Sequence, residues 1–265
     1  MIVERRAVME GRSIFQGKVT GMVVKLDEAF SFLGGVDAST GQLKVGSRGN
    51  IAGNIFVFPK GKGSTVGSFV MYDLMVHGKA PAAVVNRSAE TIVTTGAVIS
   101  SIPMVDRIDV DTLNEGDTVT VDGTAGTVEI EGVRCIRAVL CAIVVDGRIL
   151  VLHRPKTARS FADGHSLVTG KIEEGETEVE AAKREIMEET GILIGEPELS
   201  LGAIHVREGN ILWEVTPFLF RSDRVEPVLN HENTGFEWMT ADDIRADPKM
   251  VTGTPEIVIE MLKSI

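Results

Sequence analysis

The pattern of apolar segments starts twice along this chain, and the second start falls close to residue 134. Residues 1–132 hold short apolar segments between glycine-rich turns, and a new series of strand-like and helix-like segments follows them. Each half has the size of a typical domain, about 100–150 residues. The join at Gly132–Arg134 holds no long polar linker. The sequence therefore predicts two domains, residues 1–132 and residues 134–265.

Charge and cysteine content exclude several functional classes. The net charge is −11, and most of the acidic excess lies after residue 133, so neither half has the basic surplus that binds a nucleic acid polymer or an anionic membrane. The longest apolar run, Ala138–Val145, is far shorter than the ~20 residues of a transmembrane helix. Cys135 and Cys141 suit a reducing cytoplasm, and two thiolates are too few for an iron–sulfur cluster, which takes roughly three or four. We therefore expect a cytoplasmic protein that carries no cluster of its own.

The first domain is predicted to be rich in strands. A helix is expected over Phe69–His77, because Ser68 is a good N-cap and Gly78 a good C-terminal stop. The apolar, β-branched composition favours strands in four segments. They are Val19–Leu26, Asn54–Phe58, Ala82–Asn86 and Ala97–Val105.

The second domain contains an acidic helix, predicted over Glu178–Thr190. Thr177 and Glu180 form a capping box at its start, and Gly191 ends it. Three further glutamates at spacings i, i+3 and i+4 project together from one face, and their mutual repulsion favours a divalent cation such as Mg²⁺ or Mn²⁺. They are Glu185, Glu188 and Glu189.

The spacing around this helix resembles the signature of the Nudix hydrolases. Gly170, Glu176 and the run from Arg184 to Ile192 fit G-x5-E-x7-R-E-U-x-E-E-x-G-U at every fixed position. The resemblance covers residues 134–265 and implies an α+β Nudix fold, an α/β/α sandwich, that hydrolyses a diphosphate linked to another group. It assigns metal binding to Glu185, Glu188, Glu189 and the carbonyl of Gly170, and a supporting role to Arg184 and Glu176.

Two features of this half leave questions open. Glu188 and the later Glu232 are the candidate catalytic carboxylates, and for Glu232 an ordinary loop position is equally consistent with the sequence. The segment Leu167–Gly170 replaces the commoner Pro-Gly-Gly and resembles members that act on nucleoside triphosphates and pterin compounds. The sequence therefore predicts a phosphorylated small molecule as the substrate and does not name which one.

A glycine-rich loop in the first domain is the second chemical signal. Residues 60–68 read Lys-Gly-Lys-Gly-Ser-Thr-Val-Gly-Ser and lead into the expected helix. Free backbone N–H groups in such a loop favour an anion, although an ordinary turn explains the composition as well. It is not a Walker A loop, because Lys62 is followed by glycine. The candidate anion-binding residues are Gly61, Lys62, Gly63, Thr65 and Gly67.

Three segments in order resemble the small subunit of aconitase X-type enzymes, in particular the phosphomevalonate dehydratase small-subunit family. They are Ser31–Asp37, Gly61–Ser68 and Gly78–Arg87. The resemblance implies a swivelling β/β/α domain and a hydro-lyase that dehydrates (R)-5-phosphomevalonate to trans-anhydromevalonate 5-phosphate in the mevalonate pathway. It makes Ser64 the proton acceptor, although Thr65 and Val66 replace serines found in related sequences. It also implies a heterodimer, in which a large subunit carries the [4Fe–4S] cluster that this chain lacks.

The preferred interpretation is a fusion of a dehydratase small subunit with a metal-dependent Nudix hydrolase. One alternative keeps the Nudix hydrolase as the only activity, with the first domain as a binding or regulatory module. A second alternative makes the Nudix half a metabolite sensor that regulates the dehydratase and does not hydrolyse its ligand. The intact Glu185, Glu188 and Glu189 argue against this alternative.

Overall fold

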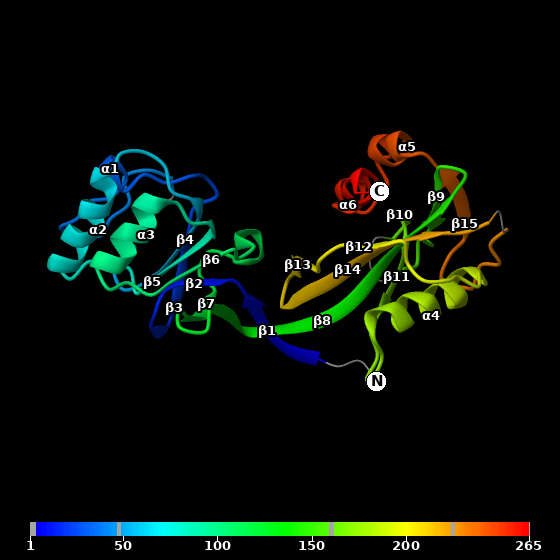
Figure 1. Ribbon diagram of the computed structural model, residues 1–265, viewed down its shortest axis with the longest axis horizontal. Helices are drawn as coiled ribbons and strands as arrows, with labels where there is room; N and C mark the ends of the chain where they lie inside the picture. Colours follow the sequence, from blue (N-terminus) through cyan, green and yellow to red (C-terminus); the bar gives the residue numbers. More distant parts are fainter. Residues whose placement is uncertain (1–3, 47–48, 159–161, 224–225, 265) are drawn as a thin grey trace. The chain divides into compact units, whose positions relative to one another are not determined.

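The computed structural model describes residues 4–46, 49–158, 162–223 and 226–264. Contacts divide the chain into two compact units, one of Arg5–Cys135 with Arg207–Leu212, and one formed mainly by the rest of residues 136–264 (Figure 1). Among the described residues, no helix is long and apolar enough to cross a membrane.

The first unit is built on a parallel sheet. Strands β3 (Lys18–Lys25), β4 (Ile55–Lys60), β5 (Ala83–Ser88) and β6 (Met104–Asp106) run parallel in that order. Strands β2 (Arg12–Phe15) and β7 (Thr118–Asp122) extend the sheet on its two sides by antiparallel pairing with β6 and β3. Strand β1 (Glu4–Glu10) pairs with β8 (Thr127–Val145). The helices are α1 (Phe32–Gly35), α2 (Val66–Val76), α3 (Thr91–Ile99) and a single 3₁₀ turn at Val110–Thr112.

Alternation along β4 gives this unit its three layers. Phe56 and Phe58 point to a core that includes Met71 of α2 and Val93 of α3. The intervening residues of β4 point to a second core, shared with the β7–β8 hairpin. Because successive side chains of a strand alternate between its faces, one sheet is covered by helices on one side and strands on the other. The predicted β/β/α fold is confirmed.

The strand predicted at Ala97–Val105 is wrong. Helix α3 occupies Thr91–Ile99, and only Met104–Asp106 forms a strand. The Glu90 carboxylate caps the helix by accepting hydrogen bonds from the backbone N–H groups of Ile92 and Val93, at 2.8 and 2.9 Å. A Cβ at Gly96 would lie 2.3 Å from the sulfur of Met71, so this glycine allows α3 to pack closely on α2. Capping and packing therefore override the β propensity of the segment.

Helix α2 begins earlier than predicted. It starts at Val66, so Ser68 lies inside the first turn and is not the N-cap. The Ser68 hydroxyl donates instead to the carbonyl of Thr65, at 2.8 Å. The predicted stop is correct, because Gly78 takes the left-handed conformation with φ +65°. The last residues of the glycine-rich loop therefore form the first turn of α2.

The second unit is a sheet that lies between helices. Its strands are the later part of β8, β9 (Arg148–His153), β10 (His165–Ser166), β11 (Val168–Lys171), β12 (Leu199–Ser200), the beginning of β13 (Ile204–Glu208), most of β14 (Ile211–Arg221) and β15 (Gly235–Met239). The segment Arg207–Leu212, which joins β13 to β14, belongs to the first unit. Its helices are α4 (Glu178–Thr190), α5 (Ala241–Ala246) and α6 (Thr254–Lys263).

Strand β8 separates two cores in this unit. Val139, Cys141 and Ile143 pack with residues of α4, whereas the intervening positions of β8 pack with residues of α5 and α6. Figure 1 shows α4 on one side of this sheet and α5 and α6 on the other. The predicted α/β/α fold is confirmed.

The boundary between residues 132 and 134 stays a proposal. Strand β8 runs through it without a break, from Thr127 to Val145. We propose that the boundary is a point within one strand, which is why no polar linker stands there.

Candidate functional sites

Helix α4 is held at both ends as predicted. Thr177 and Glu180 form a complete capping box, and Gly191 ends the helix in the left-handed conformation with φ +67°. Ala182 and Ile186 are fully buried against the sheet. These contacts fix the rotation of the helix, and with it the direction of the acidic side chains.

Arg184 is the centre of an ion-pair cluster on this helix. It forms a bidentate pair with Glu176, at 2.7 and 3.0 Å, and donates to the carbonyl of Lys171 at 3.0 Å. Its Nη1 also lies 2.7 Å from Glu185 and 3.5 Å from Glu188. The hydrogen bond from Arg184 lowers the pKa of Glu176. Arg184 thus connects the loop carboxylate to two of the three predicted metal ligands.

Glu189 is a buried carboxylate whose donors, in the part of the chain that the structure describes, are neutral. Its side chain accepts a hydrogen bond from Asn233 Nδ2 at 2.9 Å and a longer one from the backbone N–H of Thr169 at 3.4 Å. Burial first, and then the charges of Glu185 and Glu232, raise its pKa to about 7 against the lowering effect of the two hydrogen bonds. Burial likewise raises the pKa of Glu185, in spite of Arg184. Among the described residues, Glu189 therefore has no cationic hydrogen-bond partner in the place where the sequence predicts a cation.

Gly170 provides the space that Glu185 occupies. A Cβ at this position would lie 1.8 Å from the carboxyl carbon of Glu185. Gly170 is paired with Val139 in β11, so its backbone is fixed by the sheet. No larger residue fits there with Glu185 in this position.

The two remaining acidic candidates lie at the edge of the site. The Glu188 side chain is 56% exposed, and Glu232 is exposed in the turn before β15. Within the described ranges, no three acidic, histidine or cysteine side chains lie close enough together to hold a metal ion as they stand. Glu185 and Glu188 turn toward Arg184, whereas Glu189 turns inward to Asn233. The donor set still fits a hard divalent cation, because it combines oxygen ligands with a buried, uncompensated carboxylate.

Replacing Glu189 by glutamine should stabilise the metal-free protein at pH 8 and not at pH 5. The pKa of Glu189 is raised from 4.5 to about 7, so the folded state disfavours the ionised form, and this destabilisation grows as the pH rises from 4.5 through 7. Glutamine carries no charge, and after the loss of one hydrogen bond we expect a gain of about 1–2 kcal/mol above pH 7. Thermal melting in a chelator at both pH values measures the difference. An equal gain at the two pH values would contradict the electrostatic explanation.

Both cysteines are buried, as predicted. Cys141 lies on the α4 side of β8, where burial raises the pKa of its thiol, and Cys135 lies in the core of the first unit. A buried thiol with a raised pKa is a poor nucleophile and a poor ligand. The structure therefore gives both cysteines a packing role.

The glycine-rich loop follows the carboxyl end of β4. A bridge between Phe30 and Gly61 and a hydrogen bond from Lys62 N–H to the carbonyl of Phe30, at 2.8 Å, fasten the start of the loop. Gly63 takes a left-handed conformation with φ +103°, and a Cβ there would lie 2.7 Å from the hydroxyl oxygen of Ser31. The loop therefore needs glycine at this position.

Ser64 is exposed at the tip of this loop. Its hydroxyl oxygen accepts a hydrogen bond from the backbone N–H of Val66 at 3.3 Å, and its carbonyl accepts one from Gly67 at 2.9 Å. The Val66 N–H is thus the backbone donor that the described residues bring to this hydroxyl. Thr65 and Lys62 are exposed beside it, while Gly67 is buried.

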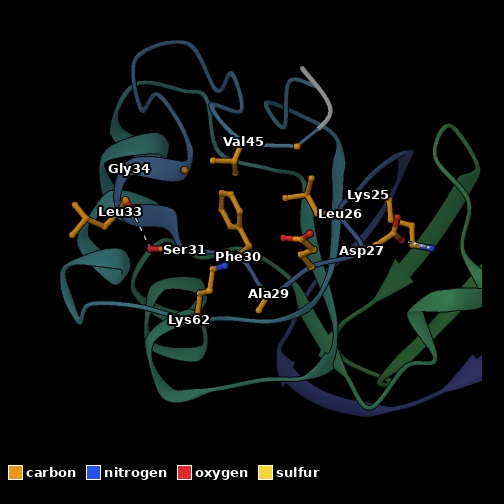
Figure 2. A pocket seen from close by; sticks show the side chains of 13 residues that line it. Lys25, Leu26, Asp27, Ala29, Phe30, Ser31, Leu33, Gly34, Val45 and Lys62 are labelled. Atoms are coloured by element: carbon orange, nitrogen blue, oxygen red, sulfur yellow. Dashed lines mark hydrogen bonds and ion pairs between the residues drawn. The ribbon is translucent and has the colours of Figure 1, made fainter.

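A cavity of about 690 Å³ opens next to the loop, and sequence reasoning did not predict it (Figure 2). Lys62 and Ser31 line it from the loop side, and residues 25–30 line it along the end of β3. Lys25 pairs with Asp27 at 3.1 Å. Ligands of open parallel sheets bind at the carboxyl ends of the strands, and that rule could have indicated Lys25.

Asn233 is a second residue that the sequence did not single out. Its amide holds Glu189, and the next residue, Thr234, donates its N–H to the carbonyl of His153 at 2.8 Å. The turn before β15 thus positions a predicted metal ligand on α4.

Comparison with known proteins assigns the two halves separately. Residues 8–130 match the aconitase X swivel domain family, and residues 136–261 match the NUDIX domain family. The phosphomevalonate dehydratase small subunit of Methanocella arvoryzae is 50% identical over 129 residues, which cover 46% of this chain and 98% of that protein.

Two solved structures resemble the halves. The crystal structure of Thermococcus kodakaraensis aconitase X in its holo-form matches with 50% identity and a TM-score of 0.46, covering 46% of this chain and 97% of that one. The MutT protein from Methanosarcina mazei Go1 matches with 22% identity and a TM-score of 0.44, covering 49% of this chain and 94% of that one. By its first half the chain belongs to the phosphomevalonate dehydratase small-subunit family, with an aconitase X swivel domain, and its second half is a NUDIX hydrolase domain.

Proposed function

We propose that the first half is the small subunit of a hydro-lyase that dehydrates (R)-5-phosphomevalonate to trans-anhydromevalonate 5-phosphate. The observation that carries the proposal is 50% identity over nearly the whole length of a phosphomevalonate dehydratase small subunit. The name of that relative implies a large-subunit partner. A [4Fe–4S] cluster on that partner would supply the Lewis acid for the departing hydroxyl, since both cysteines of this chain are buried within its cores.

Ser64 is the residue that we assign to proton abstraction. The Ser64 oxygen, in its deprotonated form, takes the C–H proton of the substrate. The electron pair of that C–H bond forms the C=C bond, and the hydroxyl leaves as hydroxide, which takes a proton from solvent to become water. The backbone N–H of Val66 would stabilise negative charge on the Ser64 oxygen, and Lys62, which is exposed in the same loop, would add a positive charge. We propose that the cavity beside the loop receives the substrate, with Lys62 and Ser31 at its wall.

We propose a second, metal-dependent activity for the NUDIX domain, the hydrolysis of a small-molecule diphosphate. Glu185, Glu188, Glu189 and the Gly170 carbonyl would hold Mg²⁺ or Mn²⁺, with Glu232 as an additional ligand or base. A bound divalent cation supplies charge neutralisation at the phosphates and lowers the pKa of an attacking water. The uncompensated burial of Glu189 supports this assignment.

The other residues of the NUDIX site position its carboxylates. Arg184 keeps Glu185 and Glu188 on one side of α4, and its bidentate pair with Glu176 ties that group to the preceding loop. Asn233 and Thr169 orient Glu189 through neutral donors, which leaves its charge available.

A substrate screen of the purified chain with Mg²⁺ tests the hydrolase proposal. The screen contains nucleoside di- and triphosphates, ADP-ribose and prenyl diphosphates, which are all small molecules with a diphosphate group. Turnover of one of them that a chelator stops would support the proposal. No turnover of any diphosphate, with Mg²⁺ or Mn²⁺ present, would count against it.

Gly170→Ala should lower hydrolysis by about 10–100-fold with little loss of stability. The new Cβ would meet the flexible end of Glu185, which must move away and take its carboxylate out of position. Gly202→Ala is the matched control, because a Cβ there meets nothing within 4 Å. Steady-state rates and melting temperatures of the two variants give the comparison. Equal rates would show that the position of Glu185 is unimportant.

A further inference from the structure

Helix α2 is apolar on both of its faces. Gly67, Ser68, Met71 and Leu74 are buried in the core of the first unit. On the outside, four apolar or aromatic side chains follow at spacings of three and four residues. They are Val66, Phe69, Tyr72 and Val76, which are 46%, 67%, 45% and 62% exposed, and we name them the α2 stripe.

Helix α2 has the apolar composition of a helix that packs against other protein on both sides. Asp73 is the one charged residue among its eleven, and it lies 3.2 Å from the ring of His77 at the helix end. A helix that is apolar all round is normally buried, whereas the outward face of a surface helix is polar. Large exposed apolar patches on a folded domain mark interaction surfaces.

The size of the stripe agrees with the centre of a protein interface. Four half-exposed side chains of this kind offer on the order of 300 Å² of apolar surface. A standard interface covers about 800 Å² on each partner, with an apolar, charge-poor centre and a polar rim. The stripe has an aromatic pair, Phe69 and Tyr72, in its middle and would need the neighbouring loop to complete such an interface.

The position of the α2 stripe next to Ser64 indicates which protein binds it. Its first residue, Val66, stands two positions after Ser64, and the Val66 N–H donates to the Ser64 hydroxyl. A protein that completes a site over Ser64 must therefore lie against the beginning of α2. A second copy of this chain seated on the stripe would instead obstruct the approach to Ser64.

We propose that the α2 stripe is the docking surface for the large subunit of the dehydratase, a proposal that rests on the dehydratase function above. The large subunit must present a complementary apolar surface next to its cluster. Docking would then place the Ser64 hydroxyl at the edge of the shared site.

The test is the affinity of the full chain for the large subunit, purified anaerobically. Phe69→Glu should weaken binding by about 30-fold or more, because a charge in the centre of the interface loses its hydration. Met22→Glu is the matched control, since Met22 is 57% exposed on β3 of the same unit. Phe69→Ala, a milder change, should weaken binding less, and melting curves verify that each variant folds.

Activity separates docking from catalysis. At saturating large subunit, Phe69→Glu should recover most of the dehydration rate, whereas Ser64→Ala should bind normally and stay inactive. Unchanged affinity in folded Phe69→Glu would overturn the docking proposal. Self-association of the wild type that Phe69→Glu abolishes, with large-subunit binding intact, would assign the stripe to a second copy instead. Absence of both binding and dehydration in the wild type would refute the proposed dehydratase function itself.

Discussion

Glu189→Gln should lower the metal-dependent hydrolysis rate by about 100-fold or more while the metal-free protein becomes more stable at pH 8. A 100-fold loss corresponds to about 2.7 kcal/mol of transition-state stabilisation, within the range that a positioned cation supplies. The amide keeps the size of the carboxylate and one of its hydrogen bonds, so the fold is retained. Opposite changes in activity and stability distinguish a functional carboxylate from one that merely holds the structure.

The measurement compares kcat/KM and Mn²⁺ affinity in wild type and variant, on a substrate that the wild type hydrolyses. Glu260→Gln is the control, because Glu260 is exposed on α6, which packs on the other face of the sheet from α4. We expect both quantities to fall in Glu189→Gln and to stay constant in the control. Wild-type turnover and Mn²⁺ affinity in Glu189→Gln would remove Glu189 from the metal site.

Ser64→Ala should abolish dehydration in the reconstituted enzyme, with a loss of about 100- to 10,000-fold, as expected when the base of a proton transfer is removed. Assembly should be unaffected, because the hydroxyl is exposed and its loss removes one long hydrogen bond from Val66. Hydrolysis by the NUDIX domain should also be unchanged, since its residues lie on other elements.

Parallel assays of both activities in the same preparation make this experiment decisive. Ser39→Ala is a matched control on another exposed loop of the first unit, where the serine bonds to Asp37. Full dehydration in Ser64→Ala would exclude Ser64 as the base. Loss of hydrolysis along with dehydration would show a general folding defect.

Local rules predicted the parts of the structure that depend on short segments. The bounds of α4 follow from the capping box at Thr177 and the left-handed Gly191, which are both encoded within a few residues. The resemblance to the Nudix signature implied a supporting role for Arg184, which contacts Glu176, Glu185 and Glu188. The contacts of Arg184 with the glutamates join residues at most eight positions apart, so the local sequence determines them.

Contacts between segments far apart in the sequence could not be predicted from the sequence. Helix α3 forms because Gly96 can approach Met71 of α2, a contact that no local propensity reports. Asn233 bonds to Glu189 across 44 positions, and the cavity beside the glycine-rich loop is lined by residues 25–31, 33–35, 45, 46 and 62, which come from separate segments of the first unit. The inward turn of Glu189 was also unpredicted, because it depends on donors from β11 and from the turn before β15.

We propose that this chain completes a dehydratase only together with a second subunit. Anaerobic dehydration of (R)-5-phosphomevalonate, measured with this chain alone, with the cluster-bearing large subunit alone and with both, tests it most directly. We expect turnover in the mixture and none with either protein alone, rising with added chain until the two are equimolar. Dehydration by the isolated chain, or no turnover in a mixture whose cluster is intact, would contradict the account.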